Sequence, residues 1–132
     1  MQYSTDGANW TIYSAPMSIT KGQNLYLKGN NPTGWSHDIS SAYSTLSIAG
    51  DAFIFGNVMG LLDNSAASGE EGDITDIPCD FCFFSLLEVS AGIKSISKNF
   101  LPATTLAVWC YSSMFQGCTS LTTAPDLPAE SL

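Results

Sequence analysis

The sequence predicts an α+β protein, in which a small antiparallel β cap is followed by a short right-handed solenoid of about two repeats. The first observation is a repeated phrase: LPATTL at 101–106 returns as LPAESL at 127–132, an offset of 26 residues. Self-similarity at roughly 20 to 29 residues is the spacing of leucine-rich repeats, whose units combine a short strand with a helical or irregular return. The second observation is a change of apolar period between the two halves of the chain. Together they predict a leucine-rich-repeat solenoid behind a β layer.

The first half, 1–62, has the pattern of a β-rich cap. Short β-prone runs occur at 2–4, 10–13, 25–27, 43–48 and 52–55. Asp6-Gly7 lies between the first two runs, and Asp-Gly in that position is typical of a hairpin. In the third run, alternation places Leu25 and Leu27 on one face and Tyr26 on the other. A β layer here would cover the open apolar end of a repeat stack.

The second half changes to a four-residue period. An apolar stripe runs through Leu106, Cys110, Met114 and Cys118. This spacing predicts a short helix, followed by a strand at 121–124 that ends at Pro125.

An earlier, degenerate copy of this unit is aligned by an offset of 28 residues. The offset places 81–83 on 109–111, and it predicts an earlier helix at 79–87 and an earlier strand at 93–96. The strands 93–96 and 121–124 are then expected to run parallel. The predicted repeats are a degenerate unit at 77–99, a regular unit at 101–126 and the start of a third at 127–132.

The acidic segment 63–76 reads as a mobile insert between the cap and the repeats. It is rich in Ser, Ala and Gly, and its acidic residues are Asp63, Glu70, Glu71, Asp73 and Asp76. These acids lack the fixed alternation of a known calcium loop, so a solvated insert is the preferred interpretation and a calcium site is the alternative.

The run CYSSMFQGCTSLTTAPDLPA at 110–129 resembles the BspA-like leucine-rich repeat proteins, whose units carry an AF-x-x-C-x-x-L-x-x-I type pattern. The stretches YSTDGANW, LYLKGNN, YSTLSIAG and FGNVMGLL are similar to the region that leads into such repeats. The resemblance implies a bacterial parent protein that is secreted or displayed at the cell surface. Because Met1 begins no secretory leader and LPAESL opens a repeat, we expect a fragment of a longer array.

Composition excludes several classes of function. The chain is 45% hydrophobic, which favours a folded protein, and its net charge is −8. That charge disfavours nucleic acid and anionic membranes as partners. No run approaches the ~18 apolar residues that a membrane helix needs, so membrane insertion is not expected.

The four cysteines suggest a metal site as one interpretation. Cys79 and Cys82 form a CxxC pair, and Cys110 and Cys118 could complete a zinc site. However, the second pair is widely spaced, and Cys82 aligns with Cys110 in the 28-residue offset. Packed free thiols are therefore the preferred interpretation, with a disulfide and zinc as alternatives and no cofactor or metal expected.

Catalysis has little support in the sequence. The one histidine, His37, lies beside Asp38 in a polar loop, and neither a nucleophile motif nor a glycine-rich phosphate loop accompanies it. We therefore expect a protein that is not an enzyme.

Two binding functions remain. The first is a protein-interaction or adhesion module that binds a host or microbial protein through the concave repeat face; the expected contacts are Lys94, Ser95, Thr122 and Thr123. The alternative is a carbohydrate-binding module acting through a cap loop; its expected contacts are Asn31, Trp35 and His37. Trp10 and Trp109 are interpreted as cover and core. An exposed last repeat also predicts a homodimer through the C-terminal edge.

Overall fold

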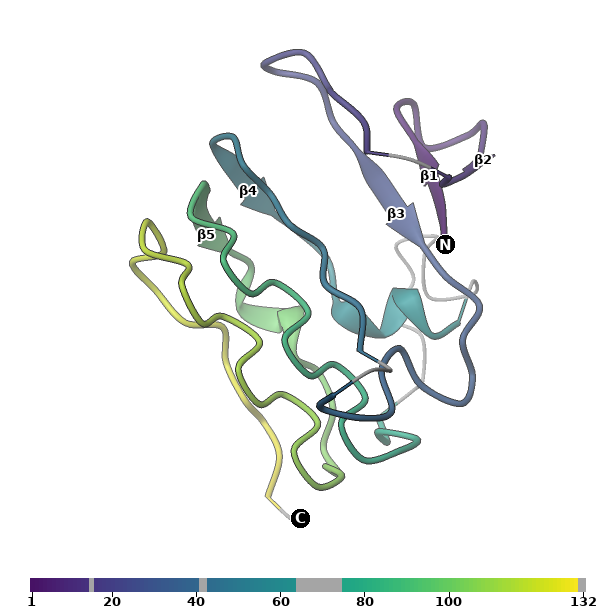
Figure 1. The fold of residues 1–132 in the computed structure, drawn as a ribbon, viewed down its shortest axis with the longest axis vertical. Helices are drawn as coiled ribbons and strands as arrows, with labels where there is room; N and C mark the ends of the chain where they lie inside the picture. Colours follow the sequence, from purple (N-terminus) through teal and green to yellow (C-terminus); the bar gives the residue numbers. More distant parts are fainter. Residues whose placement is uncertain (15, 41–42, 64–74, 131–132) are drawn as a thin grey trace.

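The computed structural model describes residues 1–14, 16–40, 43–63 and 75–130. The described chain contains no α-helix. Its regular elements are short strands in two small sheets and the 3-10 helices η1 (Val58–Leu61) and η3 (Lys98–Phe100), and most of the rest is irregular (Figure 1).

The first sheet is formed by the N-terminal strands. It contains β1 (Gln2–Ser4), β2 (Thr11–Ile12) and β3 (Tyr26–Lys28) in the antiparallel order β2-β1-β3. The hairpin predicted at Asp6-Gly7 is confirmed, since β1 and β2 pair across it and Gly7 has a φ of 76°.

The Asp6 side chain organises the β1–β2 turn. Its carboxylate accepts hydrogen bonds from the backbone N–H groups of Ala8 and Asn9, both at 2.8 Å, and from the Asn9 side chain. These bonds hold the pKa of Asp6 well below its usual range, and the bond from the Asn9 backbone N–H contributes most. The turn is therefore fixed by its own side chain rather than by burial.

The second sheet pairs two strands that are distant in the sequence. Strand β4 (Ala52–Ile54) runs parallel to β5 (Ile93–Ile96), with a register irregularity after Ala52. The predicted pairing of 93–96 with 121–124 is wrong, since 121–124 is not a strand. No strand forms at 43–48, and 52–55 does not join the antiparallel cap predicted for it.

The segments 79–90 and 107–118 consist of four-residue turns, and we call them the turn segments. Positive φ angles recur every four residues in both; they occur at Phe81, Ser85, Val89, Trp109, Ser113 and Gly117. Even-numbered residues donate N–H to the carbonyl three residues earlier, as Leu86 does to Phe83 at 3.2 Å. The helices predicted at 79–87 and from Leu106 are therefore wrong.

A backbone ladder joins the turn segments. Odd-numbered residues of the first donate to carbonyls of the second: Phe81 to Val108, Phe83 to Cys110, Ser85 to Ser112, Leu87 to Met114 and Val89 to Gln116, at 2.7–3.0 Å. Side chains 28 residues apart lie next to one another, as the stacked rings of Phe83 and Tyr111 show. The segment before β4 joins the same arrangement through Ser36 N–H to Cys82 and Leu46 N–H to Leu86, so three segments run side by side (Figure 1).

The predicted fold class, a β cap followed by a leucine-rich-repeat solenoid, is wrong. The described residues have neither the helix nor the second strand of the predicted unit, and no solenoid of such units is evident in them. The physical reason is that an apolar residue at every fourth position faces inward in a run of four-residue turns as well as in a helix. Cys110, Met114 and Cys118 are indeed buried, but in turns.

One hydrophobic core is formed by residues of the turn segments, of η1 and β5, and of 100–103. Its largest fully buried apolar members are Phe83, Met59, Leu62, Leu86, Ile93 and Met114. Leu27 of β3 packs against the same cluster, which ties the N-terminal sheet to it. Residues 64–74 of the predicted insert and 131–132 of the predicted third repeat lie outside the described residues.

Candidate interaction surface

An aromatic row crosses the three side-by-side segments at the protein surface. We define it as Tyr43, Phe84, Phe81 and Trp109. The ring centroids of Tyr43 and Phe84 lie 5.4 Å apart, those of Phe84 and Phe81 6.2 Å, and those of Phe81 and Trp109 6.5 Å. The first two pairs meet edge to face and the last pair is stacked with an interplanar angle of 12°. The row is therefore continuous.

The four-residue turns place these rings. Phe81 and Trp109 have nearly the same positive φ, 58° and 59°, so their side chains leave the two turn segments in the same direction. The Asp80 carboxylate accepts a hydrogen bond from the Val108 N–H at 3.0 Å, which fixes the start of the second segment against the first. The row is thus held by backbone that is itself hydrogen-bonded.

Both ends of the row are open to solvent. Trp109 is 61% exposed and Tyr43 is 40% exposed, while Val108 beside Trp109 is 58% exposed. Phe81 and Phe84 between them are half-buried. A connected group of aromatic rings that is exposed at both ends is unusual on a surface that needs only solubility. Tyr and Trp are also the residues that most often carry the binding energy of protein interfaces.

Sequence reasoning missed this row. The interpretation of Trp109 as a core residue is wrong, because Trp109 is exposed and its ring stacks on Phe81 instead of entering the core. The 28-residue offset aligns Phe81 with Trp109 and was the signal that could have found the stack. Trp10 is half-buried under Lys28, whose Nζ lies 4.1 Å from the ring centroid.

The residues predicted to bind a protein partner come together only in part. Lys94 and Ser95 lie on β5, where Lys94 Nζ contacts the Asp51 carboxylate at 3.1 Å and the Ser120 hydroxyl at 3.3 Å. Thr122 and Thr123 are exposed in irregular chain. Phe53, opposite Ser95 on β4, is 63% exposed. The sheet therefore presents a mixed surface instead of the predicted concave face.

The residues predicted to contact a glycan have mainly intramolecular partners. Trp35 Nε1 donates to the Ser44 carbonyl at 2.9 Å, and the Asn31 amide donates to the Leu61 carbonyl at 2.7 Å. His37 is exposed. Because the Trp35 indole N–H and one Asn31 amide hydrogen are already engaged, fewer polar groups remain to orient a sugar.

The four cysteines are free thiols. Cys82, Cys110 and Cys118 are buried, and Cys79 is half-buried. Burial raises the pKa of Cys82 to about 12 and raises the pKa of the other three thiols. Thiols of this kind are poor nucleophiles at neutral pH.

A thiol-specific reagent checks this arrangement. At neutral pH we expect Cys79 to react first, since it is the most exposed, and Cys82, Cys110 and Cys118 to react only when the protein opens. Mass-spectrometric counting of the labelled cysteines measures this order of reaction. Fast, equal labelling of all four sites in the folded protein contradicts it.

The raised thiol pKa values also predict how stability depends on pH. Because folding raises the thiol pKa values, the unfolded chain loses its thiol protons first, so stability should fall as pH rises above the ordinary thiol pKa of 9.0.

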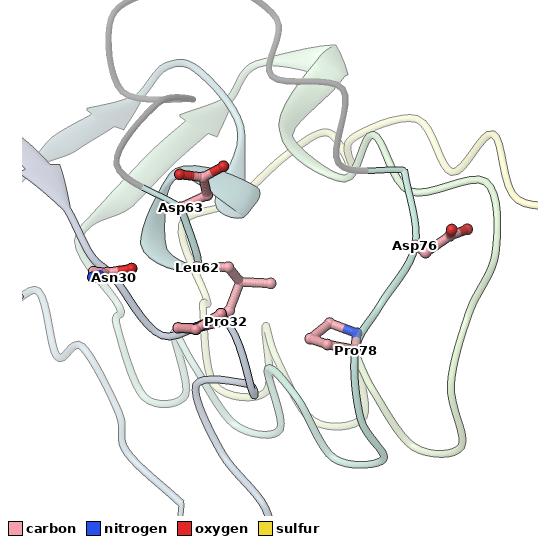
Figure 2. A pocket seen from close by; sticks show the side chains of 6 residues that line it. All are labelled: Asn30, Pro32, Leu62, Asp63, Asp76 and Pro78. Carbon is pink, nitrogen blue, oxygen red and sulfur yellow. The ribbon is translucent and has the colours of Figure 1, made fainter.

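A cavity of about 330 Å³ lies where the loop after β3 meets the end of η1 and the chain before the first turn segment (Figure 2). Its lining residues are Asn30, Pro32, Leu62, Asp63, Asp76 and Pro78. The carboxylates of Asp63 and Asp76 do not converge (Figure 2). Among the described residues, no group of three or more His, Cys, Asp or Glu side chains could hold a metal ion. Glu70, Glu71 and Asp73 of the alternative calcium site lie outside them.

Comparisons with known proteins do not identify this chain: no family model, no curated protein and no solved structure matches it. Among the described residues, no helix has both the length and the apolar character to cross a membrane.

Proposed function

We propose that this chain is a non-enzymatic protein-interaction module that binds a protein partner through the aromatic row. The observation that carries the proposal is the continuous contact of Tyr43, Phe84, Phe81 and Trp109 across three chain segments, with both ends exposed. Such rings offer a large apolar area with few rotatable bonds, so little conformational entropy is lost on binding.

The resemblance to BspA-like surface proteins suggests where such a module acts. We propose a bacterial, secreted or cell-surface parent protein, for which the partner is a host or microbial surface protein. The net charge of −8 supports a partner that is neutral or basic at the contact, because long-range repulsion slows the approach of acidic surfaces. The predicted contacts Lys94, Ser95, Thr122 and Thr123 belong to a separate surface around β5 in this proposal.

A substitution in the row tests the proposal. Binding is measured by biolayer interferometry against a panel of purified mucosal and matrix proteins, using the whole chain. For a partner found in this way, Trp109→Ser should weaken binding at least about ten-fold, as expected when a large exposed Trp ring of the contact surface is removed.

The matched control is Ile12→Ser. Ile12 is 72% exposed on β2, so the change removes similar exposed apolar character from a different surface. It should leave the affinity unchanged. Equal loss in both variants, or none in Trp109→Ser, contradicts a contact through the row.

The carbohydrate-binding alternative is tested with a glycan array. Exposed aromatic rings can also stack on sugars, and Trp35 retains a half-buried ring beside the exposed His37. If a glycan binds the chain, and its binding is lost in Trp35→Ala but not in Trp109→Ser, the result favours this alternative over the proposal.

A further inference from the structure

The hydrogen bonds of the turn segments have a direction. In the first segment, the odd-numbered N–H groups of 81–89 all donate outward to carbonyls of the second segment, while the even-numbered N–H groups are used inside the segment. A turn segment therefore has one edge that donates and an opposite edge that accepts. This differs from a β-strand edge, which presents donors and acceptors alternately.

The second turn segment repeats this geometry. Trp109, Ser113 and Gly117 have positive φ angles of 59°, 56° and 77°, at the positions that match Phe81, Ser85 and Val89. Its even-numbered residues make the same internal bonds, for example Ser112 N–H to the Trp109 carbonyl at 3.0 Å. The odd-numbered N–H groups must therefore point away from the first segment.

These N–H groups form a row that we call the donor edge. Its members are the backbone N–H groups of Trp109, Tyr111, Ser113, Phe115 and Gly117. Within the described part of the chain, none of them donates to a backbone carbonyl. The carbonyls of 107, 109, 111, 113 and 115 accept the internal bonds, and those of the even residues 108–116 accept the ladder. The donor edge thus presents donors without matching acceptors.

Because the donor edge presents only N–H groups, its polarity limits which partner can bind there. Two copies related by a two-fold axis would place N–H groups against N–H groups, so the homodimer predicted from the sequence gains no backbone pairing from this edge. An anionic polymer would offer acceptors, but the net charge of −8 repels it. A peptide with carbonyls at every second residue satisfies the row without that cost, as 107–118 does for the first segment.

We infer that the donor edge binds a neutral or basic peptide segment of a partner protein, which adopts the four-residue-turn conformation and accepts the five backbone hydrogen bonds. The mode is that of strand addition at a sheet edge, with main-chain hydrogen bonds supplying the affinity.

The probe is a synthetic peptide with the sequence of 107–118, AVWCYSSMFQGC, kept reduced. In the intact chain these carbonyls are engaged by 81–89, whereas in the free peptide they are available. Amide hydrogen exchange is followed residue by residue by NMR on the labelled whole chain. In the free protein the odd amides of 81–89 should exchange slowly and those of the donor edge quickly.

Saturating peptide should then slow exchange of the donor-edge amides by about ten-fold or more. The matched control peptide is 79–90, CDFCFFSLLEVS, which forms the same turns in the protein but carries Asp80 and Glu88. The acidic peptide should bind more weakly, because the negatively charged chain repels it. Added salt should narrow the difference in affinity between the two peptides. If the neutral peptide leaves the donor-edge amides unprotected, or if these amides are already protected in the free chain, the inference is overturned.

The same experiment in Trp109→Ser separates this inference from the proposed function. The substitution removes an exposed ring and leaves the backbone donors in place. Protection of Tyr111, Ser113, Phe115 and Gly117 by the peptide should persist, even where binding through the aromatic row is lost. If the substitution abolished both the peptide protection and the binding through the aromatic row, the Trp109 side chain, and not the donor edge, would carry the peptide contact.

Discussion

Gly92→Ala should lower the free energy of unfolding by about 3 kcal/mol, as overpacking against backbone does when neither side can move away. A Cβ built on Gly92 collides with the Gly50 carbonyl oxygen, which is backbone and cannot change rotamer. The two strands approach closely here, because Ala52 N–H donates to the Gly92 carbonyl at 3.0 Å and Ala52 is the partner of Ile93. Relieving the collision therefore requires β4 and β5 to separate. Urea denaturation followed by circular dichroism measures the change.

Gly50→Ala is the matched control for this prediction. Gly50 supplies the colliding oxygen, yet a Cβ added at Gly50 itself meets no atom within 4 Å. Its φ is not in the positive range, so alanine fits and stability should stay within about 0.5 kcal/mol or rise slightly, because the unfolded chain loses freedom. If both variants unfold at the same urea concentration as the parent chain, the close approach of β4 and β5 is not present in solution.

Local signals in the sequence found the parts of the fold that local forces determine. Asp-Gly specified the β1–β2 hairpin because the Asp6 carboxylate and the positive φ of Gly7 act within a few residues. The 28-residue alignment matched Phe81 with Trp109, but the stacking of these two rings at the surface was not inferred from it. By contrast, the pairing of Ala52–Ile54 with Ile93–Ile96 depends on chain closure over about forty residues, for which neither strand carries a local signal.

The turn segments could not be told from helices by apolar spacing. In both structures every fourth residue faces inward, so the buried Cys110 and Met114 fit each interpretation. The difference lies in positive φ at residues such as Phe81 and Trp109, which intrinsic preference disfavours for aromatic side chains. Packing and the ladder hydrogen bonds override that preference. The aromatic row depends on the same backbone conformation, so predicting a helix also concealed the candidate site.

Phe83→Ala should lower the free energy of unfolding by about 3–5 kcal/mol, the range for emptying a buried aromatic site. Phe83 is fully buried, and its ring stacks on that of Tyr111 with centroids 6.0 Å apart and an interplanar angle of 17°. Its N–H also donates to the Cys110 carbonyl at 2.8 Å, as the second of the five ladder bonds. The ring therefore joins both turn segments to the core, and its removal leaves a cavity in the core cluster. Thermal and urea unfolding measure the loss.

Two control variants locate the origin of this effect. Phe55→Ala removes the same ring from a position that is 82% exposed, and it should change stability by less than about 0.5 kcal/mol. Tyr111→Phe keeps the stacked ring and deletes a buried hydroxyl that has no hydrogen-bond partner in the described structure, so it should be neutral or slightly stabilising. If Phe83→Ala cost no more than Phe55→Ala, hydrogen bonds alone would hold the turn segments together. The larger loss would instead identify the buried Phe83 ring, stacked on Tyr111, as what holds the two turn segments on the core, because the ladder hydrogen bonds are still possible in the variant.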